Sequence, residues 1–349
     1  MDRVVLARNT ALGLRPHYFH EAGAAHAFSI RRLFSEHPEL PRVIDSAGLR
    51  QYFERQPDGL RSCFKGILPV PSGMELRLRN GSMILSEAEL PEPCGRSLIE
   101  LLELVLEELL ARSHRPAFAL SGGLDSALLL ALLRRRGRAM PVFTLITSIP
   151  GYCEREMTLG SARAIGEHAV TEITASAEDF ITALPEAIAA CETPLYNLHP
   201  VSKWLLAREL RERGFDLVIT GDGADQVFAG ADGRNYLPII GAMARAAGMT
   251  LGCPFLDERL IALARAIGVD ANKSGLRAAA AELLPREIFE RRKAPCFMPD
   301  LNLSLFRNAA ADAMLAGSLQ MAPPKDTPSP EHTLWITATL LSQKLGVVG

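Results

Sequence analysis

The feature that most constrains the fold is a repeated order of strand and helix in the second part of the chain. Apolar runs typical of strands occur at 117–120, 141–147, 170–175 and 216–220. Stretches with helical spacing of apolar residues lie between them, at 97–113, 126–135, around 157–168, 177–191 and 202–214. Such alternation indicates βαβ units with helices on both faces of a sheet. The sequence therefore predicts an α/β fold with a doubly wound, mainly parallel sheet.

The first part of the chain has a different pattern. Short strand-like runs separated by turn signals lie at 4–7, 16–19, 26–30 and 74–79. Two prolines and a glycine in residues 89–95 are typical of a linker. We therefore expect a small β-rich domain over residues 1–90 and a second domain over 96–349, in which 323–332 is a surface loop before a last helix.

Two of the predicted strands end in glycine turns. SGGLDS (121–126) follows the strand at 117–120, and GDGADQ (221–226) follows the strand at 216–220. Ligands of open parallel sheets bind beyond the carboxyl ends of the strands. Gly122 and Gly123 would let backbone N–H groups line a concave site for anionic oxygen, at the positive end of the helix that follows. Neither turn matches a Walker A loop or G-x-G-x-x-G, yet the first predicts a phosphate site.

Each turn also carries a carboxylate that a phosphate would repel. Asp125 and Asp225 occupy similar places in the two turns. Two carboxylates that face one polyphosphate indicate a Mg²⁺ ion between them and the ligand. The alternative is that Asp125 caps a helix and Asp225 belongs to a tight turn.

Composition excludes several other classes of protein. A net charge of −2 gives no basic field for nucleic acid. The sequence contains no run of 18 apolar residues, so it predicts no membrane span. Asp2 and Arg8 bracket the first apolar stretch, which is not the pattern of a signal peptide. Six separated cysteines without a C-x-x-C pair are typical of free thiols in a reducing cytoplasm. We expect a cytoplasmic protein. The sequence does not determine its oligomeric state, and a homodimer is among the alternatives.

At this point the sequence resembles a known family. SGGLDS (121–126) is similar to the pyrophosphate loop of the PP-loop ATP pyrophosphatases, which cleave ATP to AMP and pyrophosphate. The stretches 220–230, 253–260 and 272–297 resemble the asparagine synthetase-like amide ligases. Residues 6–19 and 64–81 resemble the second half of that family's glutaminase domain. The resemblance implies an adenine nucleotide α-hydrolase-like fold after a truncated, β-rich remnant of a glutaminase-type domain.

The resemblance also implies roles for individual residues. Asp125 and Asp225 would bind Mg²⁺, and Lys293 would neutralise charge as the adenylate and then the tetrahedral intermediate form. The residues implied to hold ATP and its pyrophosphate are Ser121, Gly122, Gly123, Ser126 and Gly221, with main-chain atoms around Ala119 and Leu145 on the adenine.

The chain departs from the family at two places. Glutamine-dependent members need an N-terminal cysteine, whereas Asp2 follows Met1 here and the first cysteine is Cys63, so we expect no glutamine hydrolysis. Where the family has a Glu-Ala-Arg run before P-F-L-D, this chain has Thr-Leu-Gly at 250–252. β-Lactam synthetases use a tyrosine and a glutamate in this region, and the sequence offers no match to that dyad. Asp222 would either accept a proton from the attacking amine or shape the turn.

These observations predict an ATP-dependent, AMP-forming amide synthetase. Its substrate would be a small-molecule or peptide carboxylate that also carries an amine, and the leading version is a cyclisation to a β-lactam or macrolactam. One alternative is an asparagine synthetase that uses free ammonia. Another is a non-catalytic relative that binds ATP or a partner chain.

Overall fold

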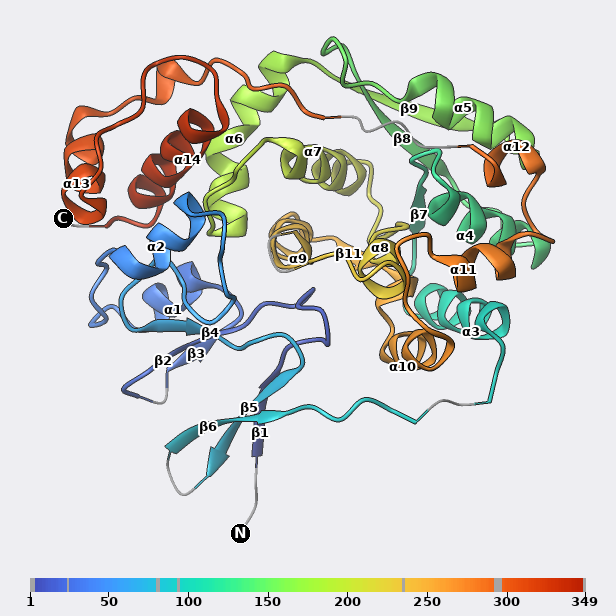
Figure 1. Ribbon diagram of the computed structural model, residues 1–349, viewed down its shortest axis with the longest axis horizontal. Helices are drawn as coiled ribbons and strands as arrows, with labels where there is room; N and C mark the ends of the chain where they lie inside the picture. Colours follow the sequence, from blue (N-terminus) through green and yellow to red (C-terminus); the bar gives the residue numbers. More distant parts are fainter. Residues whose placement is uncertain are drawn as a thin grey trace.

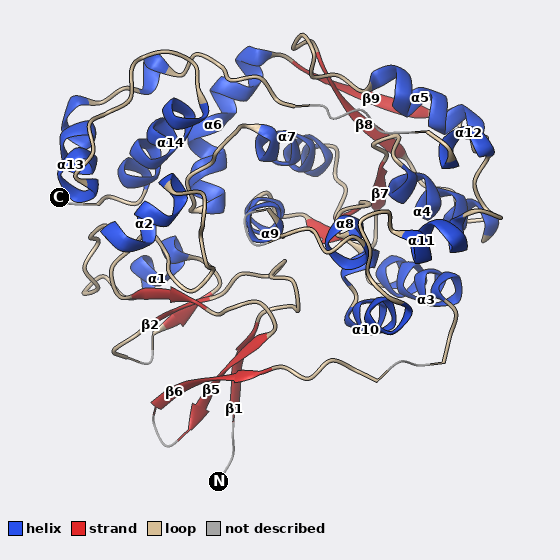
Figure 2. Cartoon of the chain, in the orientation of Figure 1, coloured by secondary structure: helices blue, strands red, loops and turns tan. Residues whose placement is uncertain are grey.

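A five-stranded, wholly parallel sheet lies at the centre of the protein (Figures 1 and 2). The computed structural model describes residues 4–23, 25–79, 82–92, 95–233, 236–291 and 297–347. The strand order is β11-β10-β7-β8-β9, so the order reverses between β7 and β10. The strands are β7 (Pro116–Ala119), β8 (Val142–Thr147), β9 (Val170–Ala175), β10 (Leu217–Ile219) and β11 (Thr250–Gly252). The predicted α/β fold is confirmed, and β11 adds an edge strand that the sequence did not predict.

Helices cover both faces of the sheet because neighbouring strand residues point to opposite sides. Phe118 and Ile219 pack with leucines of α3 (Leu98–Ala111) and α4 (Leu124–Arg135). Ala117 and Val218, one position earlier in each strand, pack with α7 (His199–Glu212) on the other face. Strands buried on both faces read as continuous apolar runs, which is how they appear in the sequence.

Side-chain caps fix where two of the predicted helices begin. Ser97 and Ser176 each accept a hydrogen bond from the N–H three residues later, whose own acidic side chain binds back to the cap. No helix of the described residues is long and apolar enough to cross a membrane. The remaining helices of this part are α5 (Arg155–Ala164), α6 (Ala177–Cys191), α8 (Ala224–Phe228), α9 (Leu237–Ala246), η1 (Pro254–Leu256), α10 (Glu258–Ile267), α11 (Ser274–Ala280), α12 (Arg286–Phe289), η2 (Ser304–Phe306), α13 (Ala309–Leu319) and α14 (Pro330–Lys344).

The N-terminal segment combines two small antiparallel sheets with two helices. The sheet orders are β1-β5-β6 and β3-β2-β4. The strand predicted over 26–30 is wrong beyond Ala27, because the Ser29 hydroxyl accepts from Arg32 N–H and caps a helix instead. The elements are β1 (Val4–Arg8), β2 (Tyr18–His20), β3 (His26–Ala27), α1 (Ile30–Glu36), α2 (Ser46–Phe53), β4 (Ile67–Pro69), β5 (Met74–Arg79) and β6 (Ser82–Glu87).

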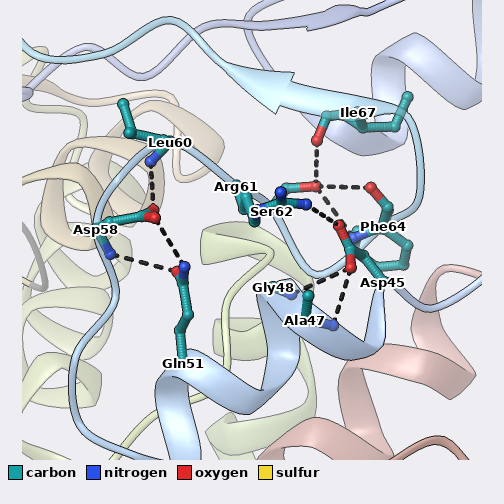
Figure 3. A network of polar contacts seen from close by, with 10 residues as sticks. All are labelled: Asp45, Ala47, Gly48, Gln51, Asp58, Leu60, Arg61, Ser62, Phe64 and Ile67. Atoms are coloured by element: carbon teal, nitrogen blue, oxygen red, sulfur yellow. Dashed lines mark hydrogen bonds and ion pairs between the residues drawn. The ribbon is translucent and has the colours of Figure 1, made fainter.

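Side-chain hydrogen bonds order the loop between α2 and β4, which has little regular structure (Figure 3). The Gln51 amide donates to Asp58 at 2.7 Å, and the other oxygen of Asp58 accepts from Leu60 N–H at 2.7 Å. The buried Ser62 hydroxyl donates to the carbonyl oxygen of Ile67 at 2.6 Å. These bonds satisfy polar groups that burial would otherwise leave unpaired.

This segment shares its apolar core with the helices at the end of the chain. Leu33 and Phe64 belong to the same buried cluster as Phe180 of α6 and Trp335 of α14. The buried carboxylate of Glu192, just after α6, accepts from the N–H groups of Ile30 and Arg31 at 2.7 and 2.6 Å. Burial raises the pKa of Glu192 to about 7, although these two bonds favour its charged form. The N-terminal strands therefore pack on the rest of the chain, as expected for a layer too small to bury its own core.

A close contact between the two parts lies at Gly241 in α9. A Cβ atom at this position would lie 1.8 Å from the carbonyl oxygen of Leu14. Only glycine lets the N-terminal segment come this close to the helix.

We predict that Gly241→Ala lowers the free energy of unfolding by about 1–3 kcal/mol, because the methyl group must push the Leu14 backbone away. Gly317→Ala in α13 is the matched control, since nothing lies within 4 Å of its added methyl. There alanine should be neutral or stabilising by up to about 1 kcal/mol. Urea unfolding compares the two variants. An equal change in the free energy of unfolding in the two variants would contradict the close contact at Gly241.

Candidate active site

A cavity of about 390 Å³ lies beyond the carboxyl ends of the strands, where β7 and β10 meet. This is the point at which the strand order reverses, the usual ligand site of such sheets. Gly122 and Gly123 lie in the first turn beside it, and Lys293 lies outside the described residues. The predicted site residues that line the cavity are Ala119, Ser121, Asp125, Ser126, Leu145, Gly221, Asp222 and Asp225.

The hydroxyl of Ser126 organises the first turn. It accepts from Ser121 N–H at 3.2 Å, lies 3.0 Å from the Ser121 hydroxyl, and can donate to the Gly123 carbonyl at 3.2 Å. Gly123 begins α4 without any side-chain cap. Asp125 and Ser126 at the start of this 12-residue helix line the cavity, so the positive end of the helix suits an anion there.

Helix α5 fixes the other side of this turn. Gly122 has φ +75°, and a Cβ there would lie 2.6 Å from Thr158 Cα. The Ser161 hydroxyl donates to the Gly122 carbonyl at 2.7 Å and accepts from Arg291 at 2.9 Å. Glycine is required at 122 for both its backbone conformation and its contact.

The second turn packs directly on the first. A Cβ at Gly221 would lie 2.9 Å from Ser126 N, so the two backbones touch. Gly223 has φ +98° and begins α8, in whose first turn Asp225 lies. Asp125 lies in the first turn of α4. The contact between the turns thus brings two carboxylates from distant parts of the chain to one place.

A lysine lies between these carboxylates. The ammonium of Lys273 is 2.8 Å from both oxygens of Asp125 and 2.7 Å from Asp225. Burial works to lower the pKa of Lys273, but the two carboxylates outweigh it and raise that pKa above its ordinary value. No role was predicted for Lys273, although it lies in the stretch 272–297 that resembles the family. Its separation of 148 residues from Asp125 hides the contact in the sequence.

The carboxylate pair fits the predicted Mg²⁺. Both groups offer oxygen ligands and already converge on a single cation, the Lys273 ammonium. Within the described part of the chain no three His, Cys, Asp or Glu residues are grouped for a metal ion. Two carboxylates suit Mg²⁺ whose other ligands are phosphate oxygens and water.

A second group of charges also lines the cavity. The ammonium of Lys203 donates to Asp222 at 2.7 Å, and the Tyr236 hydroxyl donates to its other oxygen at 3.0 Å. Burial opposes the charged form of Asp222, but Lys203, Thr220 and Tyr236 together hold its pKa below the ordinary value. Burial, reinforced by Asp222, raises the pKa of Tyr236. Asp222 is therefore a fixed anion at neutral pH.

Two further aromatic side chains continue this group. The Tyr152 hydroxyl is hydrogen-bonded to Nδ1 of His199. The His199 ring stacks on Tyr236, with ring centroids 6.1 Å apart. None of these residues was predicted from the sequence, since each is isolated there and only the tertiary fold groups them: Lys203, Tyr152, His199 and Tyr236.

Comparison with known proteins identifies the family. The family model described as Asparagine synthase matches residues 98–242 and 237–323, more than half of the chain. The chain belongs to the asparagine synthase family. Membership confirms the family part of the resemblance drawn from the two turns and from 253–260.

Individual members of the asparagine synthase family match only in part. Asparagine synthetases described as glutamine-hydrolysing in Mycobacterium bovis and Mycobacterium tuberculosis are 34% identical over 131 residues, which is 36% of this chain and 20% of those proteins. Asparagine synthetase (glutamine-hydrolysing) 1 of Bacillus subtilis is 21% identical over 243 residues, or 66% of this chain and 38% of that protein. The chain thus spans between a fifth and two fifths of these relatives.

Solved structures give a weaker likeness. NMN synthetase from Francisella tularensis matches with a TM-score of 0.36 and 16% sequence identity. The matched region is 64% of this chain and 94% of that protein's chain. The ammonia-dependent NAD synthetase from Campylobacter jejuni has the same TM-score with 17% identity, and covers 64% and 92%.

We predict that Gly122→Ala destabilises the protein by about 2–4 kcal/mol, because it adds a left-handed backbone cost to a clash with Thr158. The neighbouring Gly123→Ala is the control, since φ is −75° there and its nearest contact is the Ser121 hydroxyl at 3.7 Å. Its unfolding free energy should stay within about 1 kcal/mol of the wild type. If Gly122→Ala unfolds like Gly123→Ala, the packing of α5 on the turn is wrong.

Proposed function

We propose that this protein is an ATP-dependent, AMP-forming amide synthetase that couples a carboxylate to an amine without hydrolysing glutamine. One observation carries the proposal. The two strand-end turns line one cavity, together with the start of α4 and a carboxylate pair that shares one cation. A tyrosine, a carboxylate and a lysine that bind one another line the same cavity. Membership of the asparagine synthase family supports ATP use and carbon–nitrogen bond formation.

In the first step the substrate carboxylate attacks the α-phosphorus of ATP. A carboxylate oxygen bonds to this phosphorus as the bond to the bridging oxygen breaks, and pyrophosphate leaves. The N–H groups at the start of α4 and the hydroxyls of Ser121 and Ser126 would bind the departing pyrophosphate. Asp125 and Asp225 would hold Mg²⁺, which when bound offsets the polyphosphate charge. The charge-neutralising role of Lys293 stays a prediction.

In the second step a neutral amine attacks the acyl carbon of the adenylate, AMP leaves, and the proton that the amine nitrogen loses passes to solvent. Asp222 would accept a hydrogen bond from the amine and orient it beside the acyl group. A carboxylate whose pKa is held low is a weak proton acceptor, so this position favours orientation over proton removal. Lys203 and Tyr236 keep the Asp222 side chain in place.

We propose that the amine belongs to the substrate, so that the reaction closes a lactam or macrolactam ring. The Tyr236–Asp222 pair supports this version, because a carboxylate held by a tyrosine beside the cavity can orient an amine that belongs to the substrate. Residues 1–90 would be a structural remnant of a glutaminase-type domain. The one cysteine among its described residues, Cys63, is buried, and burial raises its pKa, which makes a poor nucleophile.

A second candidate is an ammonia-dependent asparagine synthetase. The names of the relatives favour it, since those proteins are described as asparagine synthetases. The two candidates differ in the amine: free ammonia in one, a group on the substrate itself in the other.

The experiment measures AMP, pyrophosphate and amide from ATP and Mg²⁺ with three substrate sets. Amino acids and peptides that carry both a carboxylate and a free amine should yield AMP, pyrophosphate and a cyclic product in equal amounts. Product from aspartate plus ammonium would favour the second candidate, and glutamate released from glutamine in step with AMP would contradict both. Release of ADP and phosphate would overturn the adenylation step.

Variants of the carboxylate pair sharpen this assay. Asp125→Asn and Asp225→Asn should each lower pyrophosphate release by on the order of a hundredfold or more. Glu178→Gln, on the exposed start of α6, is the matched control and should change nothing. Full activity of either aspartate variant would contradict the shared site.

We further predict that Tyr236→Phe separates the two steps. The change keeps the ring that stacks on His199 but removes the hydrogen bond to Asp222. Amide formation should fall about tenfold or more, since one hydrogen bond to a charged group contributes about 1.5–3 kcal/mol, whereas ATP–pyrophosphate exchange should stay near the wild-type rate. Tyr196→Phe is the control, because the buried Tyr196 hydroxyl has no hydrogen-bond partner among the described residues. Equal loss in both steps would place Tyr236 in the fold and not in amide formation.

A further inference from the structure

Lys273 occupies the position that joins the two strand-end turns. Its ammonium lies within 2.8 Å of Asp125 on α4 and of Asp225 on α8, while its own backbone begins α11. Three elements thus meet at one positive charge. The Lys273 side chain is only 16% exposed, so this charge is not a solvated surface group.

The backbone around Lys273 is held in an uncommon conformation. Its φ of 54° is in the left-handed region, which a residue with a side chain rarely adopts. The Asp270 side chain accepts from the N–H groups of Asn272 and Ser274, and Asp270 N–H donates to the carbonyl of Phe228 at the end of α8. Such a conformation persists when its surroundings determine it. The loop therefore fixes the base of the lysine while its long side chain keeps its rotatable bonds.

We propose that Lys273 is a displaceable cation that occupies the metal position of the site until metal and polyphosphate arrive together. The ammonium lies 2.7–2.8 Å from both carboxylates, and Mg²⁺ held by the same oxygens would sit about 2.0–2.1 Å from them. One position between two side chains cannot hold both cations. Metal binding therefore requires that Lys273 leave.

The direction of this exchange follows from charge. Without a ligand, Lys273 offsets one of the two negative charges of Asp125 and Asp225. A divalent ion is therefore attracted less strongly to these two carboxylates than it would be if Lys273 were absent. Polyphosphate at the start of α4 adds oxygen ligands for the ion. It also adds negative charge with which the released ammonium can pair. The exchange is thus favourable only when metal and polyphosphate bind together. Only the polyphosphate part of this inference rests on the proposed function.

The test titrates the protein with Mn²⁺ in the absence of nucleotide. Electron paramagnetic resonance measures the concentration of free Mn²⁺ at each step. Lys273→Met removes the charge but keeps a similar apolar stem, and it should bind Mn²⁺ at least about tenfold more tightly than the wild type. Lys203→Met is the matched control and should leave the affinity unchanged, since that lysine pairs with Asp222 and not with the carboxylate pair of Asp125 and Asp225. Unchanged or weaker binding in Lys273→Met, or an equal gain in Lys203→Met, would overturn the proposal.

A measurement on the wild type covers the case in which Lys273→Met fails to fold. Acetic anhydride labelling, quantified for each lysine by mass spectrometry, reports how accessible each ammonium is. Millimolar Mn²⁺ together with inorganic pyrophosphate should raise labelling of Lys273 and leave Lys203 unchanged, whereas Mn²⁺ alone should leave both unchanged. No rise at Lys273 with both present would show that metal and polyphosphate do not displace it. Neither experiment uses ATP or a substrate, so its failure would leave the proposed amide synthetase intact.

Discussion

The site depends on one backbone contact, the packing of Gly221 against Ser126 N. Each turn follows a strand of the parallel sheet, and β7 and β10 are hydrogen-bonded neighbours. A side chain at 221 would separate the turns by pushing against the start of α4. Because glycine stands there, two carboxylates more than 90 residues apart in the sequence share one cation. Binding of anion and metal is thus a property of the sheet edge and not of either turn alone.

Charge beside the cavity is divided between two groups. Asp125 and Asp225 surround Lys273 in one group, and Asp222 pairs with Lys203 in the other. Lys273 offsets two carboxylates that would otherwise repel one another, Lys203 offsets one, and such pairs are stable only when their hydrogen bonds are complete. The first group faces the start of α4 and suits polyphosphate. The second group has aromatic neighbours and suits an organic substrate, so the division matches a reaction in which ATP and an amine meet at one acyl carbon.

The sequence predicted the parts of the structure that depend on local pattern. Buried parallel strands read as apolar runs, and β9 was predicted with its observed bounds, Val170–Ala175. The short helices α1 and α2 were missed, because a single capping side chain such as Ser29 determines the start of α1 within a strand-like run. The two aspartates were found because each follows a glycine turn. Lys273 and Tyr236 were not, since their roles come from contacts between distant segments that no spacing encodes.

The central claim is that the substrate carboxylate attacks the α-phosphorus of ATP. The most direct measurement uses a coupled substrate whose carboxylate carries ¹⁸O, with mass spectrometry of the released nucleotide and phosphates. An acyl-adenylate pathway predicts one ¹⁸O atom in AMP for each amide formed and none in pyrophosphate. Label in inorganic phosphate, with ADP as the nucleotide product, would indicate an acyl phosphate and contradict the account.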